Sequence, residues 1–163
     1  MLNQGIPDNL RGHLWAKLLN IDRAQAIHSN NLYQKLIQFK NDETERQISK
    51  DIDRTMAELN LWPEDSQCGN NKLFNVLKAY ANYDNEVGYV QGMNYIVGLL
   101  LFYNPDEEQV FWCLHQLMQK RDWRSVYTHD FPKLKTMTAI LEERLEYDQP
   151  EVLEHLRANQ LEI

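Results

Sequence analysis

The 163-residue sequence is poor in several residue types on which whole classes of protein depend. Its two cysteines, Cys68 and Cys113, stand far apart, which argues against a disulfide framework and a thiolate metal site. No two of the five histidines stand at zinc-ligand spacing with a third ligand following, so no metal site is expected. Six glycines and five prolines leave little room for the many turns of an all-β fold. The most apolar run, Tyr95 to Tyr103, is far too short to span a bilayer.

Positive charge is also scarce. The chain has 17 lysine and arginine residues against 24 aspartate and glutamate residues, and its formal net charge is −7. Proteins that bind nucleic-acid phosphates usually carry a basic stripe, so nucleic acid is not expected as a partner. The sequence also lacks a G-x-x-x-x-G-K-[ST] phosphate loop and an acidic cluster suited to Mg²⁺. We therefore expect no nucleotide, metal or other cofactor of its own.

Helical periodicity runs through nearly the whole sequence. Hydrophobic residues make up 43% and charged residues 25%, the composition of an ordinary globular domain. No run alternates convincingly over more than five residues, so we predict an all-α fold, a compact helical array without significant β-sheet. The charged stretch 40–46 is expected to be a loop or helix end, and the polar stretch 64–71 a loop. The first expected helix starts at Pro7, and four more cover about 30–39, 48–59, 73–83 and 93–103. The next starts at Pro105, with Asn104 as its cap, and the last starts at Pro150. Between these two, another helix is expected from the apolar stripe Leu134, Met137, Leu141 and Leu145.

The helix expected over 48–59 carries the most suggestive polar residues. At 100° per residue, Asp51, Arg54 and Glu58 share one flank beside the apolar face. An aspartate three residues before an arginine can hold the guanidinium and aim its remaining donors outward, which suits a phosphoryl group. On these residues alone, a solvated ladder of ion pairs is the simpler interpretation. Arg11 beside Trp15 is likewise explained by a guanidinium stacked on an indole, bracing two helices.

The stretch "GYVQGM" holds Gln91 between Gly88 and Gly92. Because glycine has no Cβ, the backbone can turn sharply there and approach another surface closely. A glutamine on a tight turn at a helix start could grip a water molecule and fix its direction, although capping of loop backbone is the simpler alternative. Neither Arg54 nor Gln91 is a nucleophile or general base by itself. Together they form half of a phosphoryl-transfer apparatus, whose other half would arrive on a partner.

Three stretches appear in an order that resembles the signatures of the TBC domain family, the GTPase-activating proteins of Rab small GTPases. "GIPDNLRGHLW", with Arg11 and Trp15, looks like the first, and "ISKDIDRT" matches the second, I-x-x-D-x-x-R-T, with Thr55 last. "GYVQGM" matches the third, Y-x-Q-G-M, with Tyr89 first. The resemblance covers essentially the whole chain. It implies that residues 1–163 form a single TBC domain, the N-terminal subdomain, without the family's C-terminal subdomain.

The resemblance also implies a function. The chain would be a GTPase activator and not itself an enzyme, contributing catalytic residues in trans to the hydrolysis of GTP bound to a Rab. Arg54 would be the arginine finger and Gln91 the glutamine finger, which reverses the simpler interpretation of both. The residues implied to support them are Asp51, which would position Arg54, and Arg11, Trp15, Tyr89, Thr55, Gly88 and Gly92.

Partner and location follow from the same resemblance. The partner would be a Rab-family small GTPase in its GTP state, which would bring GTP and Mg²⁺. The chain is expected in the cytoplasm and, through its partner, on the periphery of endomembranes. Two alternatives stay open: a catalytically silent TBC-type binding module or scaffold for a small GTPase, and a helical structural domain whose motifs are inherited but silent.

Overall fold

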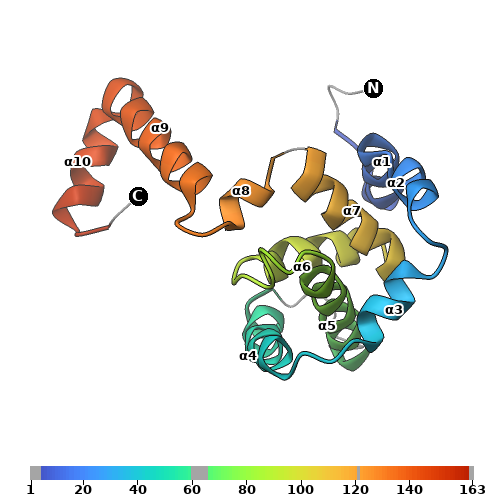
Figure 1. The fold of residues 1–163 in the computed structure, drawn as a ribbon. Coiled ribbons are helices and arrows are strands. Elements are labelled where there is room, and N and C mark those ends of the chain that lie inside the picture. The colour runs from blue at the N-terminus through green and yellow to red at the C-terminus, as the bar shows by residue number, and fades with distance from the viewer. Residues whose placement is uncertain (1–4, 60–65, 121, 162–163) are drawn as a thin grey trace. The chain divides into compact units, whose positions relative to one another are not determined.

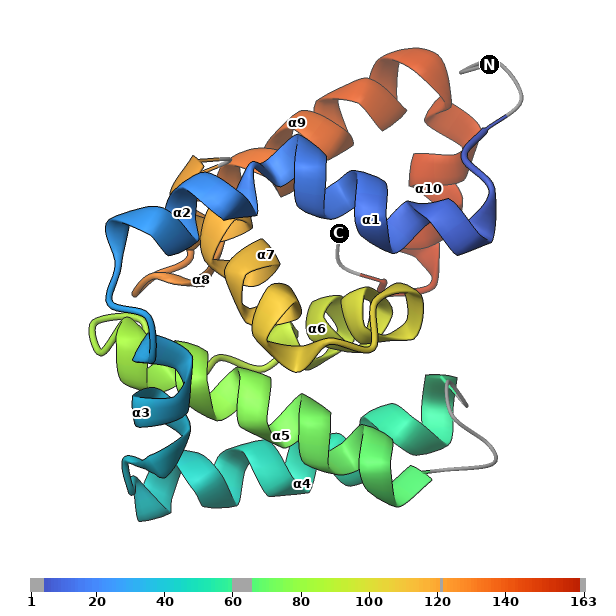
Figure 2. The same cartoon turned by 90° about the vertical axis from the view of Figure 1, so that its right-hand side faces the viewer.

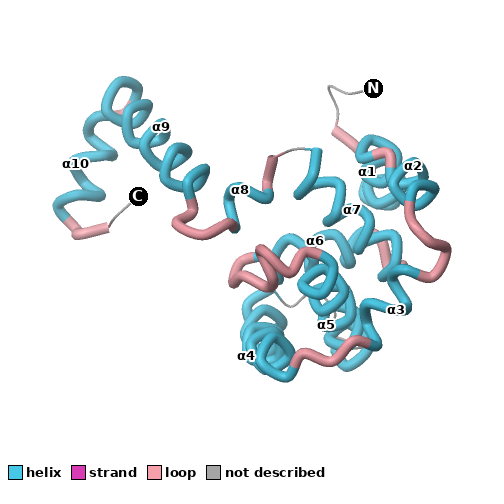
Figure 3. Tube along the Cα trace, in the orientation of Figure 1, coloured by secondary structure: helices cyan, strands magenta, loops and turns pink. Residues whose placement is uncertain are grey.

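A computed structural model describes residues 5–59, 66–120 and 122–161, except for the side chains of 53–54, 56–59 and 66–67. Every regular element in these ranges is a helix, and none is a strand (Figures 1 and 3), which confirms the predicted all-α fold. None of the described helices is both long enough and apolar enough to cross a membrane. The helices are α1 Asp8–Leu19, α2 Ile21–Ile27, α3 Leu32–Gln38, α4 Asp42–Leu59, α5 Ser66–Tyr83, α6 Met93–Tyr103, α7 Glu107–Lys120, α8 Arg124–Tyr127, α9 Pro132–Asp148 and α10 Pro150–Ala158.

The chain divides into two compact units, Met1–Asp122 and Trp123–Ile163. In the first unit α5 is the central helix, because it contacts α3, α4, α6 and α7 (Figure 2). Its buried side chains Val76, Leu77 and Tyr80 form the core of this unit together with Phe111 and Leu114 of α7. In the second unit α9 contacts both α8 and α10. All the site residues predicted from the sequence, from Arg11 to Gly92, belong to the first unit.

Several predicted helix boundaries are correct, and the errors have local causes. Helix α6 covers 93–103 as predicted, and α10 begins at Pro150. Helix α7 begins two residues later than the Asn104–Pro105 pair indicated, because Asp106 provides the cap. The Asp106 Oδ1 accepts the Gln109 N–H at 3.0 Å, while Asn104 Oδ1 accepts the Asp106 N–H at 3.1 Å and shapes the preceding loop.

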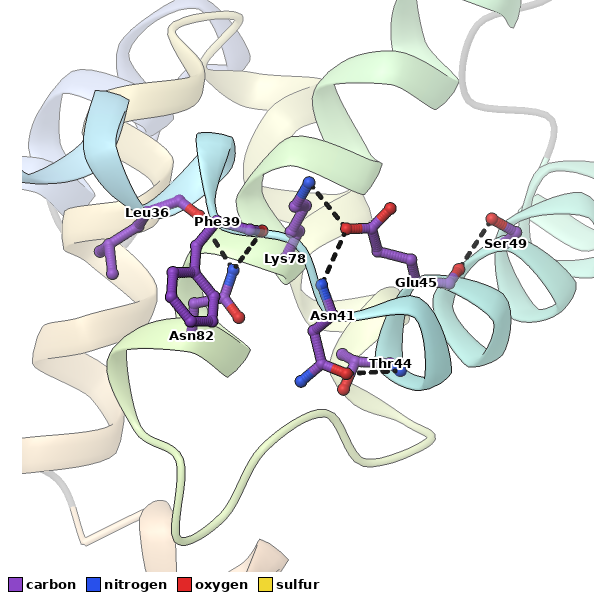
Figure 4. A network of polar contacts seen from close by, with 8 residues as sticks. All are labelled: Leu36, Phe39, Asn41, Thr44, Glu45, Ser49, Lys78 and Asn82. Carbon is purple, nitrogen blue, oxygen red and sulfur yellow. Dashed lines mark hydrogen bonds and ion pairs between the residues drawn. The ribbon is translucent and has the colours of Figure 1, made fainter.

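Of the two possibilities expected for the charged stretch 40–46, a loop or a helix end, the structure shows the helix end, because α4 begins at Asp42 (Figure 4). Asn41 Oδ1 accepts the Thr44 N–H at 3.2 Å, and Asn41 N–H donates to Glu45 Oε1 at 3.2 Å. This is the reciprocal pattern of a capping box, with the acidic partner one position later than usual. Glu45 also pairs with the buried Lys78 of α5 at 2.8 Å. The ion pair lowers the Glu45 pKa and ties the start of α4 to the central helix.

Other differences arise where tertiary contacts outweigh sequence pattern. Helix α2 was not predicted; it buries Ile21 and Ala24, and its start is secured by Gln116 of α7, whose Nε2 donates to the carbonyls of Leu19 and Asn20. Pro7 is the N-cap of α1 and not its first helical residue. The stretch expected as a loop over 64–71 is helical from Ser66, and residues 64 and 65 lie outside the described part.

The predicted apolar stripe of α9 is only partly buried. Leu134, Met137 and Leu141 are 44%, 53% and 50% exposed, whereas Leu145 is half-buried. On α10, Leu153 is buried but Val152 is 44% exposed. Helical spacing therefore identified the face correctly, but spacing does not reveal how much of a face is covered. Cys68 and Cys113 are both free, as the sequence indicated.

A buried histidine makes the stability of the first unit depend on pH. His115 of α7 is 6% exposed, and its Nε2 lies 3.0 Å from Tyr83 Oη. Burial, and then the neighbouring His28, lower the pKa of His115 from 6.5 to about 4. The folded chain therefore favours the neutral ring, while the unfolded chain takes up a proton below about pH 6.5.

We expect the free energy of unfolding to fall by about 1–3 kcal/mol as the pH drops from 6.5 to 4, because only the unfolded state binds this proton in that window. His115→Gln should flatten this dependence, whereas His13→Gln, at an exposed position of α1, should keep it. Urea denaturation at a series of pH values measures the slope. An equal slope in wild type and His115→Gln would contradict the assignment.

Candidate functional site

Arg54, the predicted arginine finger, lies within helix α4. Ile48 and Ile52 are 0% and 5% exposed, which confirms that this face of α4 points into the core. Arg54 follows two residues after Ile52, inside the helix, and its side chain lies outside the described residues. The same is true of Glu58 and of the other two predicted core residues of this face, Met56 and Leu59. Thr55, the neighbour of Arg54, is fully buried at 0% exposure.

Gln91 lies on the turn that leads into α6. The connection after α5 turns through Gly88 at φ 66° and Gly92 at φ 104°, both in the region that favours glycine. The Gly88 N–H donates to the Asp84 carbonyl at 2.7 Å, and the Met93 N–H donates to the Val90 carbonyl at 3.2 Å. The side chain of Gln91 is exposed at this turn. The predicted tight turn at a helix start is therefore correct.

Hydrogen bonds join the turn that holds Gln91 to the part of α4 that holds Arg54. The Tyr89 hydroxyl donates to Asp51 Oδ2 at 2.7 Å. On the other side of Gln91, the Gly92 N–H donates to Asn94 Oδ1 at 2.8 Å, and Asn94 Nδ2 donates to Thr55 Oγ1 at 2.5 Å. Asp51 and Thr55 are one helical turn apart and flank position 54. The structure thus brings Asp51, Thr55, Tyr89 and Gly92 into one connected cluster.

Arg11 and Trp15 belong to a different contact. The Arg11 guanidinium lies 5.1 Å from the centre of the Tyr103 ring and donates to the Tyr103 hydroxyl at 3.1 Å. The Trp15 ring meets the same tyrosine edge-on at 5.1 Å. Gly12 allows this close packing, because a Cβ there would lie 2.2 Å from the Tyr103 carbonyl oxygen. These residues fasten α1 to the last residue of α6, about 15 Å along the helix from the Gln91 turn.

The pairing of Arg11 with Trp15 therefore takes a different form from the one expected. The guanidinium stacks on Tyr103 and not on the indole, so both side chains brace α1 against α6. The pair therefore lies at the opposite end of α6 from the Gln91 turn.

Sequence reasoning missed Asn94. It is fully buried in a helix whose other buried residues are Met93, Val97, Gly98, Leu100 and Leu101. A polar amide at a buried position of an apolar helix costs free energy unless it is hydrogen-bonded, so the pattern "MNYIVGLLLFY" already contained a signal. Conversely, the described residues hold no group of three or more metal-ligating side chains.

Comparison with known proteins identifies the family. The profile of the Rab-GTPase-TBC domain matches residues 8–163, so the chain belongs to this family. It is 34% identical over 158 residues to the human Ecotropic viral integration site 5 protein homolog, covering 97% of this chain and 19% of that protein. It is 35% identical over 157 residues to Rab GTPase-activating protein eat-17 of Caenorhabditis elegans, covering 95% of this chain and 17% of that protein.

The likeness extends to three dimensions. The crystal structure of the Chlamydomonas flagellar RabGAP TBC domain matches with a TM-score of 0.77 at 27% identity, covering 94% of this chain and 51% of that chain. The chain therefore spans about half of that solved chain and less than a fifth of the two curated relatives above. The resemblance to the TBC family drawn from the three motifs is confirmed.

We expect Tyr89→Phe to lower the free energy of unfolding by about 1–2 kcal/mol, because the variant loses a hydrogen bond to a carboxylate. Tyr147→Phe, at a position that is 84% exposed, is the matched control and should change stability by less than about 0.5 kcal/mol. Urea denaturation followed by circular dichroism measures both. Equal losses in the two variants would show that the Tyr89 hydroxyl does not join α4 to the turn.

Proposed function

We propose that this chain is a GTPase-activating protein for a Rab small GTPase. It would not hydrolyse GTP alone; it would supply Arg54 and Gln91 to the GTP held by its partner. The observation that supports this most directly is the hydrogen-bonded connection between the two segments that carry these residues. Tyr89 on one side of Gln91 and Gly92 with Asn94 on the other reach the single turn of α4 that contains position 54. Family membership supports the same conclusion.

Each residue has a role that its chemistry permits. The guanidinium of Arg54 is a planar cation whose donors can neutralise the charge that grows on the γ-phosphate in the transition state. The carboxamide of Gln91 has both a donor and an acceptor, so it can orient the attacking water and replace a glutamine of the GTPase. An arginine finger accelerates hydrolysis by about 10³–10⁵, or about 4–7 kcal/mol of barrier.

The supporting residues divide into two groups in this mechanism. Asp51, Thr55, Tyr89 and Gly92 hold the turn against α4, and Gly88 allows the chain to enter it. Arg11 and Trp15 hold the far end of α6. The carboxylate of Asp51 thus serves the Gln91 turn through Tyr89, in addition to the proposed positioning of Arg54.

The partner in this proposal is a Rab in its GTP state, and GTP with Mg²⁺ belongs to that partner. The names of relatives such as GTPase-activating protein GYP5 of Eremothecium gossypii, 35% identical over 155 residues, support this class of partner. A Rab on a membrane would place the chain at the cytoplasmic surface of an endomembrane. With a net charge of −7, nucleic acid is not proposed as a partner.

The test is single-turnover GTP hydrolysis by a panel of purified Rab proteins with and without the chain. On a responsive Rab, Arg54→Ala should reduce the stimulated rate by about 10³-fold or more. Gln91→Ala should reduce it by about 10²-fold or more, because the water loses its orientation. Arg46→Ala and Gln47→Ala, at exposed positions on the same helix α4, are matched controls and should stay within about threefold of wild type.

Other outcomes distinguish the alternatives. Wild-type rates in both Arg54→Ala and Gln91→Ala would contradict the mechanism. Stable binding of a GTP-loaded Rab without faster hydrolysis would indicate a binding module or scaffold. No nucleotide-dependent partner in the panel would favour a structural domain whose motifs are silent.

A further inference from the structure

Asn94 occupies the junction between the Gln91 turn and α4. It is the second residue of α6 and is 0% exposed. A buried amide is tolerated only when its donor and acceptor are both used, and here both are. Its Oδ1 accepts the Gly92 N–H at 2.8 Å, and its Nδ2 donates to Thr55 Oγ1 at 2.5 Å. The side chain therefore connects the turn to the neighbour of Arg54.

The direction of each hydrogen bond makes asparagine specific for this place. The Thr55 hydroxyl donates its only hydrogen to the Asp51 carbonyl at 2.5 Å, so its oxygen must accept from Asn94. The Gly92 N–H needs an acceptor. A carboxylate could serve Gly92 but has no hydrogen for Thr55, and an alanine could serve neither. The amide of Asn94 meets both requirements at once, through its oxygen for Gly92 and through its nitrogen for Thr55.

The bond to Gly92 restrains the residue that precedes it. The nitrogen of Gly92 and the carbonyl of Gln91 belong to one planar peptide, so fixing the N–H also fixes the plane that follows Gln91. Gly92 has no Cβ and sits at φ 104°, so it restrains the turn little by itself. The Gln91 side chain is exposed and is not held by packing. Its direction therefore depends on bonds made by its neighbours.

We infer that Asn94 is a positioning residue that aims Gln91 at the partner's nucleotide by locking the Gln91–Gly92 peptide to Thr55 of α4. This inference rests on the proposed function. Because the same bonds end beside Arg54, Asn94 also fixes the turn relative to the arginine's helix. Loss of the amide should therefore slow the chemical step while leaving the surface that binds the partner unchanged.

The experiment measures GTP hydrolysis by a responsive Rab at rising concentrations of the chain, for Asn94→Ala and Asn94→Asp. We expect the maximal rate to fall about 10- to 100-fold, while the half-saturating concentration stays within about threefold of wild type. In a Gln91→Ala background, Asn94→Ala should lower the rate by less than about twofold more, because the two act through the same group.

Asn82→Ala is the matched control. The Nδ2 of Asn82 donates to the carbonyls of Leu36 and Phe39 at 2.9 and 3.2 Å, so this asparagine also bridges two elements of the first unit (Figure 4). Its loss should reduce stability but keep the maximal rate within about threefold of wild type. If Asn94 had only a structural role, Asn94→Ala would likewise reduce stability and leave the maximal rate within about threefold of wild type.

The outcomes separate the inference from the proposed function. Wild-type rates in both Arg54→Ala and Gln91→Ala overturn the proposed function, whereas a wild-type rate in Gln91→Ala alone overturns the inference, because Asn94 would then have no active glutamine to position. If Gln91→Ala is slow but both Asn94 variants keep the wild-type rate, the inference alone is overturned. The inference is also overturned if Asn94→Ala lowers the rate as much in the Gln91→Ala background as it does in wild type.

If circular dichroism shows that the Asn94 variants do not fold, Thr55→Val removes the same bond from the other side. It should lower the maximal rate similarly, with recovery in Thr55→Ser, and a wild-type rate in Thr55→Val overturns the inference.

Discussion

One turn of α4 holds the exposed turn before α6 through two sets of hydrogen bonds, and the candidate site depends on them. The Asp51 carboxylate accepts a hydrogen bond from the Tyr89 hydroxyl, and the Thr55 hydroxyl oxygen accepts one from the Asn94 amide nitrogen. The Asn94 amide oxygen in turn accepts the Gly92 N–H. An exposed glutamine beside a flexible glycine can adopt many orientations, and restricting it to one of them costs conformational entropy. Because folding already restricts the backbone of this turn, less conformational entropy has to be lost when a partner binds.

The other helices of the first unit fix the positions of these two segments relative to each other. Central helix α5 contacts both α4 and α6, so their separation is set by buried side chains such as Val76 and Leu77. The Lys78–Glu45 pair fastens the start of α4 (Figure 4). Arg11 with Trp15 fastens the end of α6. The two segments of the candidate site thus lie on a turn and a helix positioned by a packed scaffold, an arrangement typical of binding and catalytic sites.

The sequence revealed those parts of the fold and site that are local. The period of Ile48 and Ile52 identified the inward face of α4, and the apolar run identified α6 to the residue. The sequence left 40–46 open between a loop and a helix end, because the cap of α4 uses Glu45, whose second partner, Lys78, is remote in sequence. The contact of Arg11 with Tyr103 and the bond from Asn94 to Thr55 join residues distant in sequence, and periodicity carries no information on such pairs. The motifs named Arg54 and Gln91, but only the fold shows what connects their segments.

The most direct measurement is a crystal structure of the chain bound to a responsive Rab that carries GDP and aluminium fluoride, a mimic of the transferring phosphoryl group. If the two segments form one site, the Arg54 guanidinium and the Gln91 carboxamide will both lie within hydrogen-bond distance of the fluoride and of the attacking water. A complex in which the Rab's own glutamine holds that water, with Gln91 turned away or Arg54 facing solvent, would contradict it.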